Sequence, residues 1–309
     1  MIFTVTLNPA LDRTLLVDRL LDDDTTRVVS EQLYAGGKGI DVSRVIKALG
    51  GQTIALGLVG GYDGLQLEGL LINAGVMTDF TRIAQETRIN LIIKERGSGR
   101  QYVISAAGPE ATATEIGLFY QRITQLQGAS HLVISGSLPR GVTPNVYAQT
   151  ILAGKKKGAF VMLDADGDAL KGALDAGPTC IKPNRHELSR LVGKEMQSDA
   201  DVLSACDEIH ALGIPYVLAS LGGDGLILST RERKIKAAGP TVQVESTVGS
   251  GDSAVAGFVL AHSRGEGLED CARMAAASGT ATARTPGTEL CTRKDVDEIL
   301  PLVKVNVLA

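Results

Sequence analysis

The chain has 309 residues, 44% of them hydrophobic, which is enough to bury a sizeable core in one large α/β domain or two smaller ones. A formal charge of −4, an aromatic content of 4% and the lack of any Trp argue against a nucleic-acid-binding surface. The four cysteines have no Cys-x-x-Cys spacing and the four histidines no His-x-x-x-His pair, so neither disulfides nor a zinc site are indicated.

The residue pattern in the first third of the chain predicts short strands, two helices and a hairpin. Residues 1–8 alternate as a strand, are too short for a signal sequence and end at Pro9. Residues 88–94 and 101–105 alternate around Gly97-Ser98-Gly99 and predict a hairpin. The other elements expected here are two polar strands at 15–17 and 26–32, a helix at 42–49, a strand at 53–59 and a helix at 65–74.

The rest of the chain alternates regularly between strands and helices. Strands are expected at residues 131–135, 160–164, 179–181, 216–220 and 226–229, with a further β-like run at 241–246. Helices are expected at residues 115–126, 146–157, 186–191, 200–212, 254–264, 268–283 and 293–302. This alternation predicts a mostly parallel central sheet flanked by helices on both faces.

Two polar strand pairs do not fit that core. They lie near residues 12–33 and 88–106, and we interpret them as a small antiparallel β-lid on a single domain that spans residues 1–309. The chain has no run of about 18 apolar residues that would cross a membrane, and we expect a cytoplasmic protein.

The motif that carries the most chemistry is Thr247-Val248-Gly249-Ser250-Gly251-Asp252-Ser253, just before a helical run. Two glycines around Ser250 let several N–H groups point one way, which makes an anion site at the start of a helix. Asp252 would face the bound anion, and phosphoryl transfer to a hydroxyl needs both an anion cradle and a proton acceptor. Taken alone, the string fits ordinary helix capping equally well.

Further polar motifs follow predicted strands, where ligands of doubly wound sheets bind. Gly36-Gly37-Lys38-Gly39 opens a helix but is not a Walker P-loop, because no Ser or Thr follows Lys38; a tight turn is the alternative. Asp12 would accept hydrogen bonds from sugar hydroxyls, and the alternative interpretation is an aspartate that only stabilises a turn. Arg27 and Arg88 lie in the two lid pairs, where their forked guanidinium groups would match phosphate oxygens.

Two motifs in the second half suit a nucleotide. Asn184 and Glu187 are three residues apart on one helix face, a spacing that suits a hydrated Mg²⁺ and phosphate oxygens but also a capping box. Residues 220–225 would let the backbone approach a nucleotide, and a hairpin turn is the alternative.

In this order, these motifs resemble the phosphofructokinase B branch of the ribokinase-like carbohydrate kinases, over essentially the whole chain. The branch includes 1-phosphofructokinases, tagatose-6-phosphate kinases and a minor bacterial 6-phosphofructokinase. The resemblance is carried by residues 6–12, 36–40, 87–90, 135–139, 181–184, 220–222 and 246–253. It implies a ribokinase-like α/β fold whose β-lid also forms homodimers.

The resemblance also implies a role for each matching residue. Asp252 would be the general base, with the amides of Gly249, Ser250 and Gly251 as the anion hole. The sugar would be bound by Asp12, Gly37 and Lys38, and its existing phosphate by Arg27, Arg88 and Ser137. ATP and Mg²⁺ would be bound by Lys182, Asn184 and Glu187, with Ser220, Gly222, Gly225 and Gly287 bordering the nucleotide.

The expected activity is ATP- and Mg²⁺-dependent phosphorylation of a ketohexose phosphate. Residues 87–90 resemble 1-phosphofructokinases and favour fructose 1-phosphate, whereas residues 107–110 are closer to tagatose-6-phosphate kinases. Asp41 stands where the family usually has Asn, and residues 164–167 depart from the common Asp-Ser-Ser-Gly. A catalytically silent sugar-phosphate sensor is therefore the alternative of another class. An oxidoreductase lacks support because residues 57–61 give no dinucleotide fingerprint.

Overall fold

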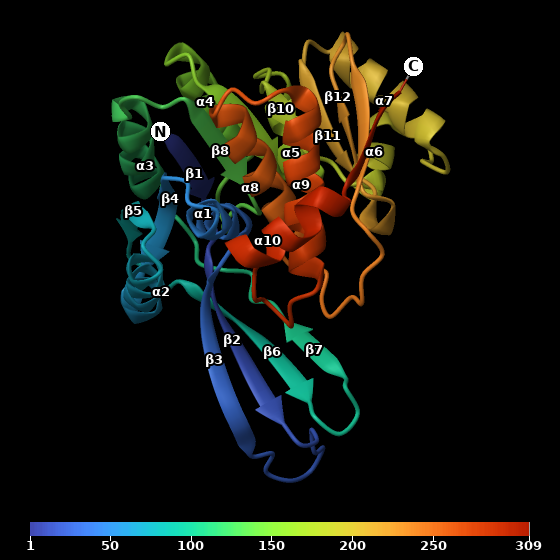
Figure 1. Cartoon of the computed structure of the whole chain (residues 1–309). Coiled ribbons are helices and arrows are strands. Elements are labelled where there is room, and N and C mark those ends of the chain that lie inside the picture. The colour runs from blue at the N-terminus through green and yellow to red at the C-terminus, as the bar shows by residue number, and fades with distance from the viewer. Residues whose placement is uncertain (309) are drawn as a thin grey trace.

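The main body is a ten-stranded sheet, seen in a computed structural model that describes residues 1–308. Its strand order is β14-β13-β12-β11-β10-β9-β8-β1-β4-β5, with parallel pairing from β11 to β5 and antiparallel pairing among β11, β12, β13 and β14 (Figure 1). The mostly parallel sheet is thereby confirmed. The strands are β1 (Ile2–Thr6), β4 (Thr53–Gly60), β5 (Met77–Ile83), β8 (His131–Ser135), β9 (Phe160–Asp164), β10 (Cys180–Ile181), β11 (Tyr216–Ser220), β12 (Leu226–Ser229), β13 (Lys234–Ala238) and β14 (Lys304–Leu308).

Helices cover both faces of this sheet. The helices are α1 (Lys38–Ala48), α2 (Gly61–Asn73), α3 (Ala113–Gln125), α4 (Asn145–Lys156), α5 (Gly167–Leu174), α6 (Arg185–Val192), α7 (Asp199–Ala211), α8 (Ser250–Ser263), α9 (Leu268–Ala283) and α10 (Arg293–Ile299), with 3₁₀ turns at Gly222–Asp224 and Leu300–Leu302. Among residues 1–308 no helix is both long and apolar enough to cross a membrane.

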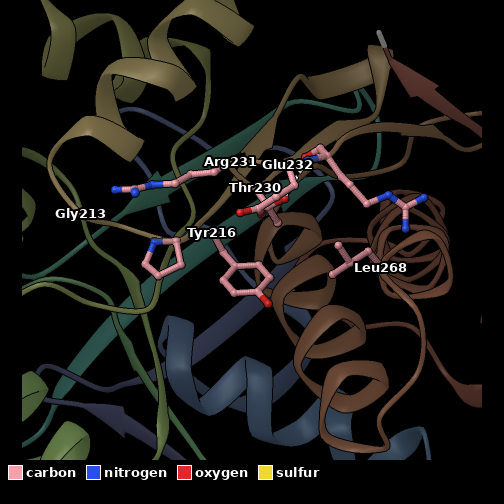
Figure 2. A pocket seen from close by; sticks show the side chains of 8 residues that line it. Gly213, Tyr216, Thr230, Arg231, Glu232 and Leu268 are labelled. Carbon is pink, nitrogen blue, oxygen red and sulfur yellow. Dashed lines mark hydrogen bonds between the residues drawn. The ribbon is translucent and has the colours of Figure 1, made fainter.

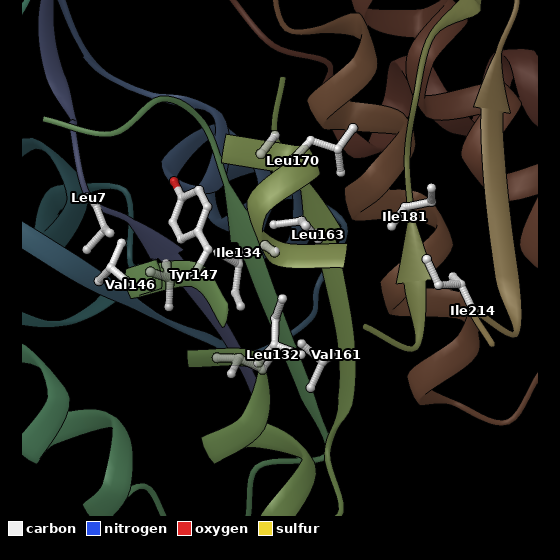
Figure 3. Packing of buried hydrophobic residues seen from close by; sticks show 14 of the residues in the cluster. Leu7, Leu132, Ile134, Val146, Tyr147, Val161, Leu163, Leu170, Ile181 and Ile214 are labelled. Atoms are coloured by element: carbon white, nitrogen blue, oxygen red, sulfur yellow. The ribbon is translucent and has the colours of Figure 1, made fainter. Parts of the chain in front are cut away.

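Side chains on the two faces of the central strands belong to two separate hydrophobic clusters. Leu132 and Ile134 of β8 pack with α3 to α7, while Val133 between them packs with α1, α8, α9 and α10. Figure 3 shows the first cluster, in which Tyr147 of α4 lies over the sheet. Every residue of β1 and β8 is buried, as expected of parallel strands that helices cover on both sides.

The lid is a separate four-stranded sheet of order β3-β2-β6-β7 that extends from the carboxyl end of the main sheet (Figure 1). Its strands are β2 (Ala10–Val17), β3 (Val28–Gly36), β6 (Arg88–Glu95) and β7 (Gln101–Ile104). The hairpin around Gly97-Ser98-Gly99 is confirmed as β6–β7. The expected antiparallel pairing is found for β2 with β3 and for β6 with β7, but β2 and β6 pair in parallel at the centre of the lid. The reason is that β2 follows β1 and β6 follows β5, so both strands leave the main sheet in the same direction.

Some expected elements differ. Residues 241–246 form no strand and are mostly exposed, since the outer edge of β13 is already paired with β14. The helix expected from residue 254 begins four residues earlier, at Ser250, which brings Asp252 into its first turn. Strands β5, β13 and β14 and helix α5 were missed because each is short or only partly buried.

Candidate active site

The loop before α8 has the conformation that an anion cradle needs. Gly249 has a φ of 76°, and a Cβ there would lie 2.5 Å from Leu290 Cδ2, so only glycine fits. Ser250 and Gly251 then open α8, where amide groups of the first turn have no intrahelical acceptor. Ser250 Oγ is buried and without a hydrogen-bond partner among residues 1–308, which leaves it available to a ligand.

Asp252 lies in this first helical turn and is 9% exposed. Burial, together with the charge of Asp164, raises the pKa of Asp252 to about 7, although Lys38 and Lys182 act in the opposite direction. A carboxyl group with a pKa near neutrality suits a general base, because it is available for proton transfer at working pH.

Beneath Asp252, two lysines converge on the buried carboxylate of Asp164. Lys38 Nζ is 3.2 Å and Lys182 Nζ 3.4 Å from Asp164 Oδ1. Burial alone would raise the pKa of Asp164, but Lys182 and Lys38 outweigh it and lower that pKa. Lys182 Nζ also lies 3.4 Å from the position of a Cβ on Gly251, so its charge is next to the anion cradle.

Asp164 is a residue that the sequence reasoning noticed without giving it a role. The structure makes it the anchor of both lysines, and its Oδ2 has no hydrogen-bond partner among residues 1–308. The available signal was an acidic residue that ends the buried strand β9.

Asp12 stands on β2 at the root of the lid. Asn90 Nδ2 of β6 donates to Asp12 Oδ1 over 2.8 Å, and Gly36 of β3 packs directly against the carboxylate. Burial raises the pKa of Asp12, opposed by the Asn90 hydrogen bond and by the charge of Arg88. Gly37 follows with a φ of 117° at the start of α1, where Lys38 is the first residue.

Asp41, the departure from the family pattern, is paired with a cation. Arg44 Nη1 donates to Asp41 Oδ1 over 2.9 Å and also to the Ala35 carbonyl. Burial raises the pKa of Asp41 well above its usual range, Arg44 lowers it, and the charges of Asp252 and Asp12 raise it further. Asp41 is therefore a buried carboxyl group within electrostatic range of both Asp252 and Asp12, with Arg44 as its cationic partner.

Asn8 joins Arg88 and Ser137 into one wall. Arg88 Nη2 donates to the Asn8 carbonyl over 2.9 Å, and Asn8 Nδ2 donates to Ser137 Oγ over 3.2 Å. Asn8 Nδ2 also donates to the Ala107 carbonyl over 3.0 Å. Sequence reasoning quoted Asn8 in a motif but assigned it no role, since an amide after a strand gives no sign of which loops it will connect.

Arg27 is not brought into this wall. It is exposed and precedes Val28, which pairs with Val17 at the far end of the lid, whereas Arg88 pairs with Ala10 at the near end. Seven residues of strand separate the two ends, a span of roughly 23 Å. Within one chain, Arg27 therefore does not share a phosphate with Arg88.

The residues expected at the nucleotide lie along the same edge of the sheet. Asn184 and Glu187 form a reciprocal capping box at the start of α6, with hydrogen bonds of 2.9 and 2.8 Å. The Ser220 amide donates to the Pro183 carbonyl over 2.9 Å, so these two segments are neighbours. Gly222 and Gly225 have positive φ values of 65° and 90° around the turn after β11.

Gly287 lies in the segment between α9 and α10, next to the loop that precedes α8. Ser246 Oγ donates to the Gly287 carbonyl over 2.7 Å. Lys94 of the lid strand β6 approaches the same residue, because a Cβ on Gly287 would lie 2.6 Å from Lys94 Nζ.

A cavity of about 450 Å³ lies at the other end of the sheet (Figure 2). It is lined by Tyr216, which begins β11, and by Thr230 and Arg231, which follow β12. It includes none of the expected site residues.

A profile of the pfkB carbohydrate kinase family matches residues 6–295. The chain belongs to this family. Its members are carbohydrate kinases, so the chain is an ATP-dependent sugar kinase that transfers phosphate to a hydroxyl.

Relatives cover the pfkB chain from end to end. It is 34% identical to a 1-phosphofructokinase of Bacillus subtilis over 308 residues, covering 100% of both sequences. It is 34% identical to ATP-dependent 6-phosphofructokinase isozyme 2 of Escherichia coli, covering 96% of this chain and 97% of the relative.

Solved structures agree with the fold. Phosphofructokinase-2 of Escherichia coli in complex with potassium superposes with a TM-score of 0.93 at 34% identity, covering 97% of this chain and 98% of that one. A ribokinase of Arabidopsis thaliana complexed with ribose and ATP superposes with a TM-score of 0.78 at 25% identity, over 97% and 98% of the two chains. The ribokinase-like fold is thereby confirmed.

Proposed function

We propose that this pfkB kinase, working as a single domain, phosphorylates a ketohexose phosphate with ATP and prefers fructose 1-phosphate, giving fructose 1,6-bisphosphate. The observation that carries the proposal is the buried carboxyl group of Asp252, with a pKa of about 7, in the first turn of a helix that opens on a glycine-rich anion cradle. That pairing serves proton removal and phosphoryl transfer at one place.

In this mechanism the substrate hydroxyl lies between Asp252 and the γ-phosphate of ATP. Asp252 accepts the hydroxyl proton as the oxygen attacks in line, and the amides of Gly249, Ser250 and Gly251 stabilise the charge on the transferred group. Lys182 adds a positive charge beside the cradle, and Asp164 holds it there. The lid would exclude water and so limit hydrolysis of ATP.

Mg²⁺ would supply charge neutralisation for the ATP phosphates when bound. Among residues 1–308 no cluster of three metal-ligating side chains forms a protein cage. Glu187 is 6% exposed and uses Oε2 in the capping box, while Asp164 Oδ2 has no partner, so acidic oxygens remain for a hydrated ion. This donor set fits Mg²⁺ that keeps waters and binds mainly through phosphates. Asn184, Glu187 and Asp164 would hold it.

The sugar would lie between the base and the lid root. Asp12, Asp41, Gly37 and Lys38 would bind its hydroxyls, and Arg88 with Ser137, which Asn8 connects, would bind the resident phosphate. Because burial raises the pKa of Asp41 and Arg44 pairs with its carboxyl group, Asp41 would repel a phosphosugar less than an exposed aspartate does. This smaller repulsion weakens the sensor alternative, in which Asp41 repels the phosphosugar.

The substrate preference is supported by the 1-phosphofructokinase of Bacillus subtilis and by residues 87–90. The 6-phosphofructokinase of Escherichia coli, at the same identity, makes fructose 6-phosphate the second candidate. Tagatose 6-phosphate remains a third candidate, on residues 107–110 alone.

The lid is the proposed homodimer interface. Four large apolar residues on its strands are exposed, Val28, Val29, Val103 and Ile104, at 44–57% of their surface. Pairing of two lids would bury them and would bring the Arg27 of one copy toward the other copy's site. The four free, buried cysteines and the use of ATP suit the cytoplasm, where thiols stay reduced.

A coupled ADP-release assay with MgATP tests this proposal. We expect turnover of fructose 1-phosphate with a kcat/KM at least about tenfold above fructose 6-phosphate and tagatose 6-phosphate, and far above free fructose. Binding of phosphosugars without ADP release from any of the four would contradict the kinase proposal and favour the sensor.

A further inference from the structure

A groove with a volume of about 490 Å³ opens beside Arg88. It is lined by residues 85–87 of the β5–β6 loop, by Arg88 at the start of β6, by residues 106–109 and by Arg140. The groove adjoins the wall that Asn8 forms with Arg88 and Ser137, because Arg88 belongs to both.

Two guanidinium groups are fixed to the same short loop in this groove. Arg88 Nη1 donates to the Ala106 carbonyl over 2.8 Å, and Arg140 Nε donates to the Gly108 carbonyl over 3.1 Å. These neutral acceptors set the orientation of both side chains and leave N–H donors of each free for a ligand.

The positive charges of this pair are not neutralised. Arg44, Arg185 and Arg233 each contact a carboxylate, whereas neither Arg88 nor Arg140 forms an ion pair among residues 1–308. Glu86 lines the groove, but its carboxylate accepts a hydrogen bond from the Asp63 amide over 2.9 Å, at the start of α2.

The backbone also holds Arg140 in place. Its amide donates to the Pro109 carbonyl over 3.1 Å, and its carbonyl accepts from the Ala111 amide over 3.3 Å. Arg140 is exposed, so its side chain reaches a ligand without displacing core residues. A cation positioned before binding loses little entropy when the ligand arrives.

We propose that Arg140 is a second cation for the phosphate that the sugar already carries, and so selects phosphosugars over free sugars. The inference rests on the proposed function and names a residue that determines its substrate class. Two guanidinium forks match a tetrahedral dianion. Asp12 marks the side on which the sugar would lie, because Ala10, two residues before it on β2, pairs with Arg88 and the charge of Arg88 acts on the Asp12 carboxylate.

The test is Arg140→Gln, assayed for ADP release with fructose 1-phosphate and with free fructose. The KM for fructose 1-phosphate should rise about 10–100-fold, the usual worth of a charge-assisted contact, with kcat changed less than about threefold. The parameters for free fructose and for MgATP should stay unchanged. Arg140→Lys should recover part of the loss, since it keeps the charge without the fork.

The matched control is Arg264→Gln, which removes another exposed cation at the far end of α8 and should leave every parameter unchanged. Calorimetric binding of fructose 1-phosphate and of fructose separates this inference from the proposed function. If the wild-type protein binds the phosphosugar without turnover, the kinase proposal fails while the Kd of Arg140→Gln still decides the role of Arg140. An unchanged KM and Kd, or an equal loss for fructose, would overturn the inference.

Discussion

The pKa of Asp252, the proposed base, depends on where the chain buries its carboxyl group. Its carboxyl group is surrounded by Asp164, Lys38 and Lys182, and burial is the largest cause of its raised pKa. A free aspartate would be fully ionised at neutral pH and a much weaker base. The two lysines keep the carboxylate form accessible while they balance Asp164.

The raised pKa predicts how activity and stability depend on pH. Because the base must be ionised, kcat/KM for fructose 1-phosphate should fall about tenfold per pH unit below about pH 7 and level off above it. A buried acid with a raised pKa contributes stability that is present below its unfolded pKa of 3.8 and is lost as pH rises through about 7.

Asp252→Asn removes the ionisable group, and with it the free-energy cost of ionising a buried carboxyl group. The variant should therefore be more stable than the wild type at pH 8, by on the order of 1–4 kcal/mol, and about equal to it near pH 4. Chemical denaturation at the two pH values measures the difference. Equal stability at pH 8 would contradict the raised pKa.

At the scale of elements, the lid was the least predictable part. Polar alternation in residues 88–94 and 101–105 located its hairpin, but the parallel contact of β2 with β6 depends on how β1 and β5 lie in the main sheet. Strand β14 joins the sheet as the partner of β13, and it is too exposed to be recognised from its own sequence. Local patterns report a strand's own faces and not its neighbours.

The exposed apolar residues of the lid give a testable consequence. Val29→Asp with Ile104→Asp places two charges on the proposed dimer interface and should convert a dimer into a monomer in light scattering. The KM for fructose 1-phosphate should rise about tenfold or more, since Arg27 would lose its place in the other copy's site. The control is Leu212→Asp, at a still more exposed apolar residue after α7, and this variant should remain dimeric. A wild-type protein that is monomeric at assay concentration would contradict the proposal.

At the scale of the whole molecule, the site is an edge built by many segments. The glycine motif, the lysines and Asp12 were predictable because their residue types carry chemistry at strand ends. The convergence of Lys38 and Lys182 on Asp164, and the linking of Arg88 to Ser137 by Asn8, were not predictable. These contacts join residues more than seventy positions apart in most cases, and no spacing in the sequence encodes them.

The central claim is that Asp252 removes the proton of the attacking hydroxyl. Its most direct test is the single-turnover rate of Asp252→Asn with saturating MgATP and fructose 1-phosphate, at pH 8, where the variant is expected to fold. We predict a loss of about 10²–10⁴-fold or more in rate, with binding of both substrates retained. A variant that transfers phosphate at close to the wild-type rate would contradict the account.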